Sequence, residues 1–436
     1  MKANRSCALS LVKSLLDRHT PERLTEKDYR WNFIVNCTDN ALFNVGMAMG
    51  SMFTLFPVFA KNLGASNVEL GLILAIINLG WGIPAIWGAK MAERSAKKLN
   101  LVLKYTMGER LPYLFLALIS FFLASRFARL SLYLATLMMA LTVYTMGFLG
   151  PPWMSMIEKV IDARRRGTYF AMGSGMGAIL GIGGSMIAKN LLASNPFPQN
   201  FGYVFLTAFF FFMASFFFLA LTREVPDPKL HEDEPVINYF RNMKNVFTDR
   251  NFRNFLFERI ISSFTFGASG FVTVYLLKKL SLPDDTAANF TAIVMASQGI
   301  SSFFFGPLGD RKGHKVNLLV NKIVYVVALA LTISCTRLSQ AYVVYGLMGI
   351  VNTTGNVGGM AITLDLTSGK RKELYMGSLY FLTAPFSFLA PLICGKLADS
   401  FGYTLPMALT GAIGVFNFFF LLKFISDPRR KEQARS

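Results

Sequence analysis

Acidic and amide side chains interrupt one of the long apolar stretches in this 436-residue chain. Asp39 lies about 12 Å along a helix that begins near Trp31, at a rise of about 1.5 Å per residue. The same stretch carries Asn36, Asn40 and Asn44 at four-residue spacing. Because a carboxylate in an apolar segment usually faces a cavity or a partner, Asp39 could bind a cationic ligand or carry a proton. The alternative is a carboxylate whose hydrogen bonds are satisfied by the neighbouring amides.

A second apolar stretch carries a comparable polar series. It contains Glu258, Ser262, Thr265 and Ser269, with Arg259 beside them. Glu258 is either a second proton-carrying carboxylate or an interfacial carboxylate paired with a neighbouring base. Two further stretches supply small polar residues at helical spacing, namely Thr142 and Thr145 in one, and Asn352, Thr353, Asn356 and Thr363 in the other. These could hydrogen-bond a polar ligand or join packed helices.

Three more charged residues lie within apolar stretches. Glu109 and Arg110 are adjacent and could form an intramembrane ion pair, or Arg110 could pair with Asp39. Lys322 lies near the beginning of its stretch. Its long side chain is predicted to extend to the membrane surface.

The elements that must hold these residues are twelve apolar stretches, each long enough to cross a bilayer core of about 30 Å as a helix. They cover residues 31–60, 68–89, 101–125, 131–156, 168–192, 201–222, 254–279, 286–308, 316–336, 340–364, 374–396 and 403–424. Hydrophobic residues make up 53% of the chain and charged residues only 16%, which is more apolar surface than a soluble core buries. We therefore predict an all-α integral membrane protein with twelve transmembrane helices.

Basic residues are distributed unevenly between the two sides of the predicted membrane. Of the 44 Lys and Arg residues, 33 fall at the side that carries both termini, 8 fall in or beside the opposite loops, and the remaining three, Arg110, Arg259 and Lys322, lie deeper within the stretches. Since short basic loops stay in the cytoplasm, both termini are predicted to be cytoplasmic. The net charge of +19 therefore reflects membrane topology and argues against nucleic-acid binding.

Cysteine and histidine usage excludes several other classes of protein. The cysteines are far apart and show no C-x-x-C spacing, at Cys7, Cys37, Cys335 and Cys394, so no disulfide framework or metal site is predicted. The three histidines fall in predicted cytoplasmic segments. No G-x-x-x-x-G-K-[ST] occurs, which argues against an ATP-driven pump. We expect no cofactor, no metal and no enzymatic activity.

The two halves of the chain share several features in the same order, which indicates an internal duplication. Asn32-Phe33 corresponds to Asn254-Phe255, and Phe201-Gly202-Tyr203 corresponds to Phe401-Gly402-Tyr403. Six stretches per half predict two six-helix bundles related by a pseudo-two-fold axis along the membrane normal. The predicted divisions are an N-terminal segment 1–30, bundles 31–222 and 254–424, a linker 223–253 and a tail 425–436.

A basic turn follows the second stretch of each half. The second copy reads Gly306-Pro307-Leu308-Gly309-Asp310-Arg311-Lys312-Gly313-His314-Lys315. It resembles the G-x-L-x-D-R-x-G-R-K turn of the major facilitator superfamily, with His314 in place of the usual arginine. The first copy, which runs from Gly88 to Lys98, is looser, with Glu93 for aspartate and Ala96 for glycine. The resemblance extends from about residue 29 to residue 424.

This resemblance implies a gating role for the turn. A carboxylate at the end of one helix can pair with a nearby arginine and with the N-terminal end of a helix from the other half. By analogy with the family, Asp310 and Arg311 close the cytoplasmic side in one state and release it when the bundles rock, together with Glu93 and Arg94. The predicted gating motif also includes Gly88, Gly306, Gly313 and Lys315. The alternative is a basic loop that serves topology only.

The resemblance also implies positions for the polar residues. In this family the first helix of each group of three lines the central cavity, which is where Asp39 and Glu258 are expected. Third helices are peripheral, which favours a structural role for Glu109 and Arg110. A glycine-rich series at residues 173–184 resembles the G-x-x-x-G-P-x-x-G-G element of family antiporters, but it lacks the proline and is one residue short. Close helix packing is the alternative explanation.

These features predict a secondary active transporter of a small solute, working by alternating access and coupled to protons or Na⁺. One alternative is a multidrug efflux antiporter of the same fold. Another is a transport-dead relative that acts as a sensor or assembly partner, although the intact Asp310-Arg311 turn argues against it. We expect a multi-pass monomer in a bacterial inner membrane, with a small-molecule substrate and the lipid bilayer as its partners.

Overall fold

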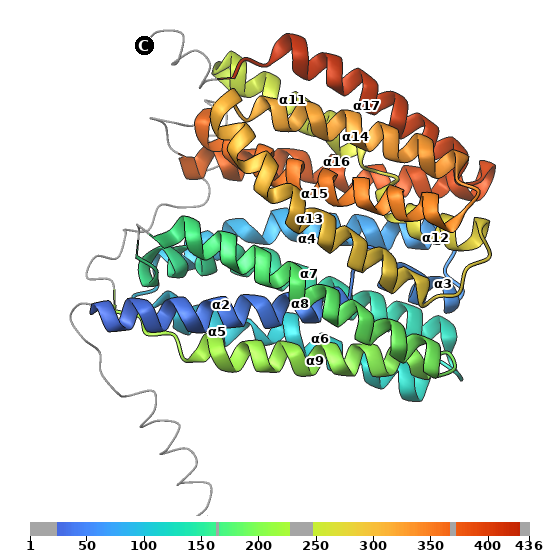
Figure 1. Ribbon diagram of the computed structural model, residues 1–436, viewed down its shortest axis with the longest axis horizontal. Helices are drawn as coiled ribbons and strands as arrows, with labels where there is room; N and C mark the ends of the chain where they lie inside the picture. The colour runs from blue at the N-terminus through green and yellow to red at the C-terminus, as the bar shows by residue number, and fades with distance from the viewer. Residues whose placement is uncertain (1–23, 163–164, 227–246, 367–371, 428–436) are drawn as a thin grey trace, which may run out of the picture.

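The computed structural model describes residues 24–162, 165–226, 247–366 and 372–427, which form helices joined by short turns and no strands (Figure 1). Within these ranges a few side chains, among them those of Glu93 and Asp310, lie outside the description. Most of the predicted N-terminal segment, much of the linker and the end of the tail also lie outside the described residues.

The helices follow the predicted stretches closely. The N-terminal half consists of α2 (Glu26–Met49), α3 (Leu55–Asn62), α4 (Asn67–Glu93), α5 (Lys98–Tyr105), α6 (Met107–Leu118), α7 (Ala128–Val160), α8 (Arg166–Ser194) and α9 (Gln199–Ala220). The C-terminal half consists of α11 (Arg250–Thr265), α12 (Val272–Lys279), α13 (Thr286–Lys312), α14 (Lys315–Ser334), α15 (Leu338–Leu366), α16 (Lys372–Phe401) and α17 (Thr404–Phe424). Below, the terminal end is the end of the molecule where α2 begins and α17 ends, and the far end is the opposite one, which carries α3 and α12.

The first span of each half is interrupted near the far end, which the sequence analysis did not predict. Gly50 ends α2, and a short turn leads to α3. In the second half, a 3-10 turn over Ser269–Phe271 separates α11 from α12. Both first spans also begin earlier than predicted, because Thr25 and Asp249 cap their N-termini by accepting hydrogen bonds from backbone N–H groups.

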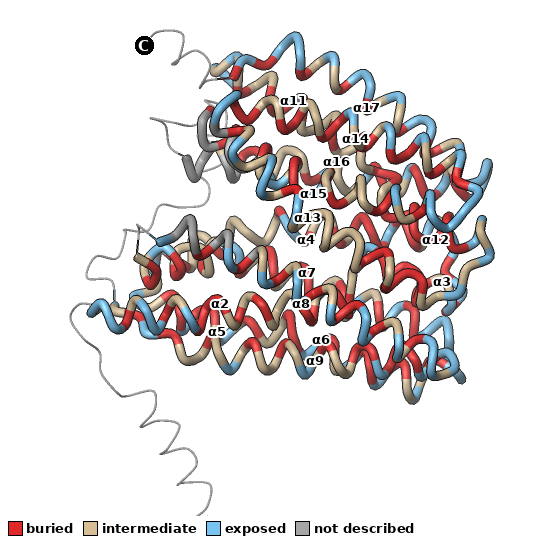
Figure 2. Tube along the Cα trace, viewed as in Figure 1, coloured by how far each residue is buried: buried red, intermediate tan, exposed pale blue. Residues whose placement is uncertain are grey.

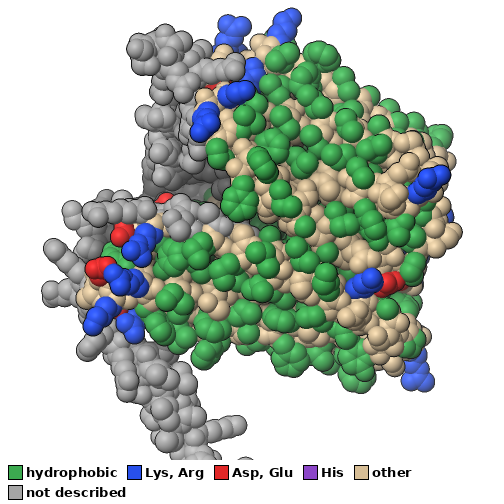
Figure 3. All heavy atoms as spheres, in the orientation of Figure 1, with side chains coloured by type: hydrophobic (Ala, Val, Ile, Leu, Met, Phe, Trp, Pro, Cys, Tyr) green, Lys and Arg blue, Asp and Glu red, His purple; other side chains and the backbone are tan. Residues whose placement is uncertain are grey.

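The surface has the character of a membrane protein. Ten helical segments of the described chain are long and apolar enough to cross a bilayer. The helices α2 and α15 have comparable length but are not among them, since their Asn, Asp and Thr residues lower their hydropathy. Hydrophobic side chains cover the middle of the visible face, while Lys and Arg gather towards its two ends (Figure 3). The protein is therefore a multi-pass membrane protein whose described spans are all helical.

Each half packs around its own interior, and two pairs of helices join the halves. In the first half α2 packs on α8 and α9, and α4 packs on α7. In the second half α15 packs on α13 and α14, and α17 packs on α14 and α11. The main contacts between the halves are α4 with α16 and α8 with α13, and the ribbons of the two halves diverge towards the terminal end (Figure 1).

The internal duplication is visible in equivalent hydrogen bonds. Asn32 donates to the backbone oxygen of Arg223 at 2.9 Å, just beyond the last helix of the first half. Asn254 donates to the backbone oxygen of Phe424 at 2.9 Å, at the end of the last helix of the second half. The two asparagines that were paired on sequence grounds therefore tie the first helix of each half to the end of its sixth span.

Several aromatic rings of the hydrophobic core pack together near the far end of the first half. Phe59 of α3 lies with its ring centroid 5.1 Å from that of Phe201 and 5.2 Å from that of Phe205. All three rings are fully buried. Buried positions follow the inward sides of the helices along both halves (Figure 2). This packing supplies a rigid frame for the polar groups described next.

Candidate functional site

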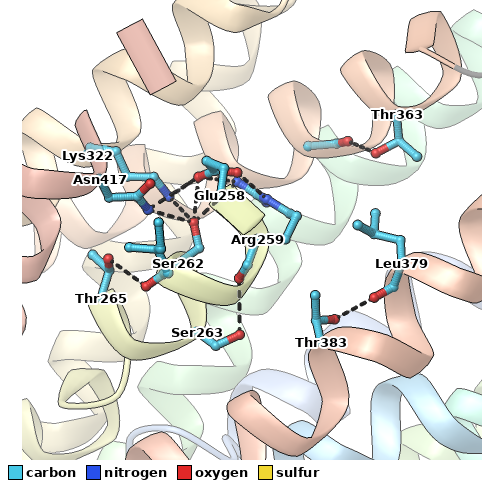
Figure 4. Close-up of polar contacts among 12 residues, drawn as sticks. Glu258, Arg259, Ser262, Ser263, Thr265, Lys322, Thr363, Leu379, Thr383 and Asn417 are labelled. Carbon is cyan, nitrogen blue, oxygen red and sulfur yellow. Dashed lines mark hydrogen bonds and ion pairs between the residues drawn. The ribbon is translucent and has the colours of Figure 1, made fainter. Parts of the chain in front are cut away.

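A group of polar and charged residues lies inside the C-terminal half. We call it the C-half cluster, and it consists of Glu258, Arg259, Ser262, Lys322 and Asn417 (Figure 4). Glu258 follows the start of α11 by eight residues, or about 12 Å along the helix. It accepts from Arg259 Nε at 2.7 Å and from Ser262 Oγ at 2.6 Å, and Lys322 Nζ lies 3.3 Å from its carboxylate.

Two further helices of the C-terminal half, α14 and α17, complete the C-half cluster. Lys322 of α14 donates to Ser262 Oγ at 2.6 Å, and Asn417 of α17 donates to the same oxygen at 3.0 Å. The side chains of Glu258 and Lys322 are both 0% exposed. Two buried charges are tolerated only when they pair and their remaining hydrogen bonds are satisfied, and these contacts meet that condition.

The prediction that Lys322 extends to the membrane surface is wrong. Its ammonium group is fully buried and lies against Glu258 and over the ring of Phe266 at 4.8 Å. The physical reason is that an interior carboxylate offers a closer partner than the membrane surface. Glu258 does pair with a neighbouring base, as one of the two predictions for it stated, because Arg259 donates two hydrogen bonds to its carboxylate.

A second buried group lies inside the N-terminal half. We call it the N-half cluster, and it consists of Asp39, Thr106, Glu109, Arg110 and Ser215. Arg110 Nη1 donates to Glu109, and Arg110 Nη2 lies 4.0 Å from Asp39 and donates to Ser215 at 3.2 Å. Ser215 in turn donates to Asp39 at 2.6 Å. Both predicted pairings of Arg110 therefore occur together.

The two clusters follow one architectural rule. In each half, a carboxylate on the first span faces a cation on the third span, and a polar side chain from the sixth span donates a hydrogen bond to that carboxylate. The first half uses Asp39 with Arg110, and the second half uses Glu258 with Lys322. The formal charges differ, because two carboxylates face one guanidinium in the first half and two cations face one carboxylate in the second.

The polar series of α2 is divided among different neighbours. Asp39 is buried and points to α6 and α9 rather than to the other half. Asn40 and Asn44 lie against Gly173 and Gly177 of α8. Asn36 is buried near the terminal end, where it donates to Thr222 at 3.1 Å. The four-residue spacing predicts one polar stripe, but the structure brings Asp39 together with Arg110 instead.

On α15, the predicted residues Asn352 and Asn356 are both exposed. The glycine-rich series of α8 lies against α2 and α13, since Gly177 meets Asn44 and Gly181 meets Met295. Close packing therefore accounts for Gly177 and Gly181, in line with the alternative explanation, whereas Gly175 and Gly183 of the same series have open space around them.

The predicted gating motif is described only in part. The carboxylates of Glu93 and Asp310 lie outside the described side chains, and the side chains of Arg94 and Arg311 are exposed. Gly88 packs against the backbone oxygen of Phe148, whereas Gly306 has open space around it. The latch between the halves thus stays a prediction.

Two carboxylates that the sequence analysis missed hold the basic turns in place. Glu224 accepts from the backbone N–H groups of Lys98 and Leu99 at 2.9 and 2.6 Å. Asp427 accepts from the backbone N–H of Lys315 at 3.0 Å, close to Gly313, whose φ of +87° suits glycine. Each is the first acidic residue after the sixth span of its half, and that shared position was the available signal.

Contacts between the halves gather towards the far end in the part of the chain that the structure describes. Asp399 of α16 accepts from the backbone N–H groups of Asn67 and Val68 at 3.0 and 2.9 Å, at the N-terminus of α4. Thr54 and Thr291 hydrogen-bond at 2.6 Å. Because a helix N-terminus attracts negative charge, the Asp399 contact stabilises closure of the far end.

The described residues contain no group of three or more His, Cys, Asp or Glu side chains that could hold a metal ion. Each half instead contains a buried ion pair, Asp39 with Arg110 and Glu258 with Lys322, whose opposite charges compensate each other inside the helices.

Comparison with known sequences gives one family match. The sequence model of the Major Facilitator Superfamily matches residues 255–436. A search of curated proteins gave no significant match.

Solved structures with the same fold cover nearly the whole chain. A bacterial homologue of the human lysosomal transporter Spinster, in an inward-facing conformation, is 14% identical with a TM-score of 0.67, over 92% of this chain and 98% of that one. A D-xylose–proton symporter is 15% identical with a TM-score of 0.63, over 92% and 99%. The nucleoside transporter NupG is 12% identical with a TM-score of 0.63, over 90% and 99%. The chain therefore resembles major facilitator superfamily transporters and has their fold.

Proposed function

We propose that the protein is a secondary active transporter that moves a small polar solute by alternating access of its two halves. The observation that carries the proposal is the way the halves meet, with described contacts such as Asp399 to α4 gathered towards the far end. Two rigid halves joined in this way can rock about a central site. The fold of secondary transporters agrees with this mechanism.

The orientation in the membrane follows from the basic residues. We infer that the terminal end faces the cytoplasm, because most Lys and Arg residues occur in the segments on that side. Closure of the far end then corresponds to a conformation that opens towards the cytoplasm. A bacterial inner membrane and a monomeric state are part of the same proposal.

The N-half cluster is the proposed place for a coupling proton. Asp39 and Glu109 face the single guanidinium of Arg110, and all three side chains are buried. An uncompensated negative charge in such a place is costly, so a proton bound there balances the charge. Movement of Arg110 relative to Asp39 during rocking would change the proton's affinity. Na⁺ is the alternative coupling ion.

Proteoliposomes loaded with a pH-sensitive dye test the proposal with mixed pools of solutes, so that the substrate need not be identified first. Pools of carboxylates, organic phosphates, sugars, amino acids and nucleosides are added outside, together with a separate pool of lipophilic cations. We expect one polar pool to produce saturable proton movement. If no pool moves protons, Na⁺ or a labelled solute, the transport function is wrong. Proton movement with the lipophilic pool alone would favour an efflux antiporter.

Replacing Asp39 with asparagine tests the coupling role. Asp39→Asn should abolish accumulation driven by a pH gradient but leave exchange of solute across the membrane intact, because exchange needs no net proton transfer. Asp285→Asn is the matched control, since Asp285 lies outside the membrane spans, between α12 and α13. Unchanged gradient-driven accumulation in Asp39→Asn would exclude this carboxylate as the coupling site.

A further inference from the structure

Arg259 differs from the other charged residues of the C-half cluster in its exposure. Its side chain is 21% exposed, whereas those of Glu258 and Lys322 are 0% exposed. Figure 4 shows Arg259 on the side of the cluster that faces Thr363 of α15 and Thr383 of α16. The guanidinium is therefore the part of the cluster that reaches beyond it.

The guanidinium of Arg259 uses only part of its donor capacity within the protein. Nε and Nη2 donate to Glu258 at 2.7 and 3.1 Å, and Nη2 also approaches Ser262 at 3.5 Å. Of the five N–H donors of a guanidinium, the two on Nη1 have no hydrogen-bond partner among the described residues. They are directed towards α15, where a Cβ placed on Gly359 would lie 3.4 Å from Nη1.

The face of α15 that meets Arg259 is polar and is not covered by neighbouring helices. One side of α15 packs on α14 through Gly355 and Gly358, and another packs on α13 through Thr353. Asn352 and Asn356 lie on the remaining side, together with Gly359, because residues three and four apart share one face of a helix. Both asparagines are exposed. Amides facing lipid would be costly, so this face is better suited to a polar ligand.

The charges of the C-half cluster favour a negative ligand. Arg259 and Lys322 carry two positive charges, and Glu258 carries one negative charge. The excess positive charge lies at Arg259, because Lys322 is enclosed by Glu258 and Ser262. In the N-half cluster, where negative charge is in excess, Asp39 and Glu109 are buried within their own half and offer no comparable exposed group.

We propose that Arg259, with Asn356 of α15, binds an anionic group of the transported solute, either a carboxylate or a phosphate. Asn352, about 10 Å from Gly359 along the same face, contacts the remainder of the solute. This inference rests on the proposed transport function and narrows its substrate class to small organic anions. The Nη1 donors, which have no hydrogen-bond partner among the described residues, and the amide of Asn356 supply hydrogen bonds to the oxygen atoms of such a group. The absence of a side chain at Gly359 leaves room for the guanidinium and ligand beside the helix.

Thermal unfolding of the purified full-length protein in nanodiscs tests the inference directly. Lactate, succinate and glycerol 3-phosphate are compared with lactamide, succinamide and glycerol as neutral counterparts. A ligand that binds only the folded state raises the melting temperature in a concentration-dependent way. We expect at least one anion, but not its neutral counterpart, to produce a saturable rise. Equal rises with both members of each pair would overturn the inference.

Variants then assign the effect to Arg259. Arg259→Gln should weaken the anion's apparent affinity by about 10- to 100-fold, because a charged hydrogen-bonding partner is lost. Arg259→Lys should retain part of the affinity, since it keeps the charge but not the planar donor fork. Arg337→Gln, at an exposed position outside the spans, is the control and should bind as the wild type does. An anion effect that persists in Arg259→Gln would refute the assignment.

A second variant tests the same position without removing the charge of Arg259, so that a folding defect caused by that loss cannot explain the result. Gly359→Leu keeps every charged residue but fills the space beside Nη1, and it should also abolish the anion effect. Normal anion binding in Gly359→Leu would contradict the proposed position. In the dye-loaded proteoliposomes, movement of a neutral solute alone would overturn the anion inference and leave transport standing. Failure of every pool would instead count against transport itself.

Discussion

Replacing Asp399 with asparagine should open the far end of the molecule. In the structure, the carboxylate accepts hydrogen bonds of 3.0 and 2.9 Å from the first two backbone N–H groups of α4, which belongs to the other half. Asparagine removes the negative charge and one of the two acceptor oxygens. It therefore weakens both the hydrogen bonds and the attraction of the carboxylate to the positive end of the helix.

The size of this effect can be worked out from the contact. Asp399 is exposed, so solvent screens the charge, and we expect a loss of about 1 kcal/mol. Because about 1.4 kcal/mol corresponds to a tenfold change in an equilibrium constant, the ratio of closed to open far ends should fall about fivefold. Overall stability should change little, since the contact joins two halves that each keep their own core.

Distances between spin labels at Ser194 and Ser339 report this change. Both positions are exposed and flank the far end, one in each half. The variant should show a larger population of long distances than the wild type. Asp285→Asn is the control, because it removes one negative charge from the same end without a described contact to the first half. Equal distance distributions in wild type and Asp399→Asn would refute the role of this contact.

Three further predictions concern packing, the buried ion pair and pH. Gly88→Ala should cost about 1–3 kcal/mol by thermal unfolding, since its new methyl group would overlap the backbone of α7, whereas Gly150→Ala has open space and should cost little. Lys322→Met should destabilise the protein by about 1–3 kcal/mol, because its charged contacts to Glu258 and Ser262 are lost while Arg259 still compensates Glu258, with the exposed Lys396→Met as its control. Burial raises the pKa of Asp284, although the hydrogen bond that Asn62 donates to its carboxylate lowers it. The closed far end, which buries this carboxyl group, should therefore be favoured at acidic pH and become less favoured as pH rises through that pKa, measured with the same spin labels and absent in Asp284→Asn.

The sequence allowed the helices and the duplication to be predicted because both leave repeated local patterns. The pairing of Asn32 with Asn254 is confirmed by their equivalent hydrogen bonds to the ends of α9 and α17. The interruption after Met49 was missed, although Gly50-Ser51 gave a signal for it. An apolar span is easily read as one continuous helix, because hydrophobicity alone does not show a break.

The partners of the buried charges were harder to predict. Helical spacing places Asp39 on a face of α2 but does not say which neighbour covers that face, so its position against α6 and α9 required the structure. Lys322 was assigned to the membrane surface because its partner Glu258 is far away in the sequence. The polarity around Glu224 predicts only that the chain leaves the membrane there, because its partners Lys98 and Leu99 are more than 120 residues away in the sequence. Tertiary contacts decide each of these cases.

The measurement that tests alternating access most directly compares the two ends of the molecule at once. One pair of spin labels at Ser194 and Ser339 follows the far end, and a second pair at the exposed Asn100 and Lys312 follows the terminal end. Across pH values and in the presence of a stabilising solute, the proposal predicts that one distance lengthens as the other shortens. Distances that stay fixed, or that change in the same direction at both ends, would contradict it.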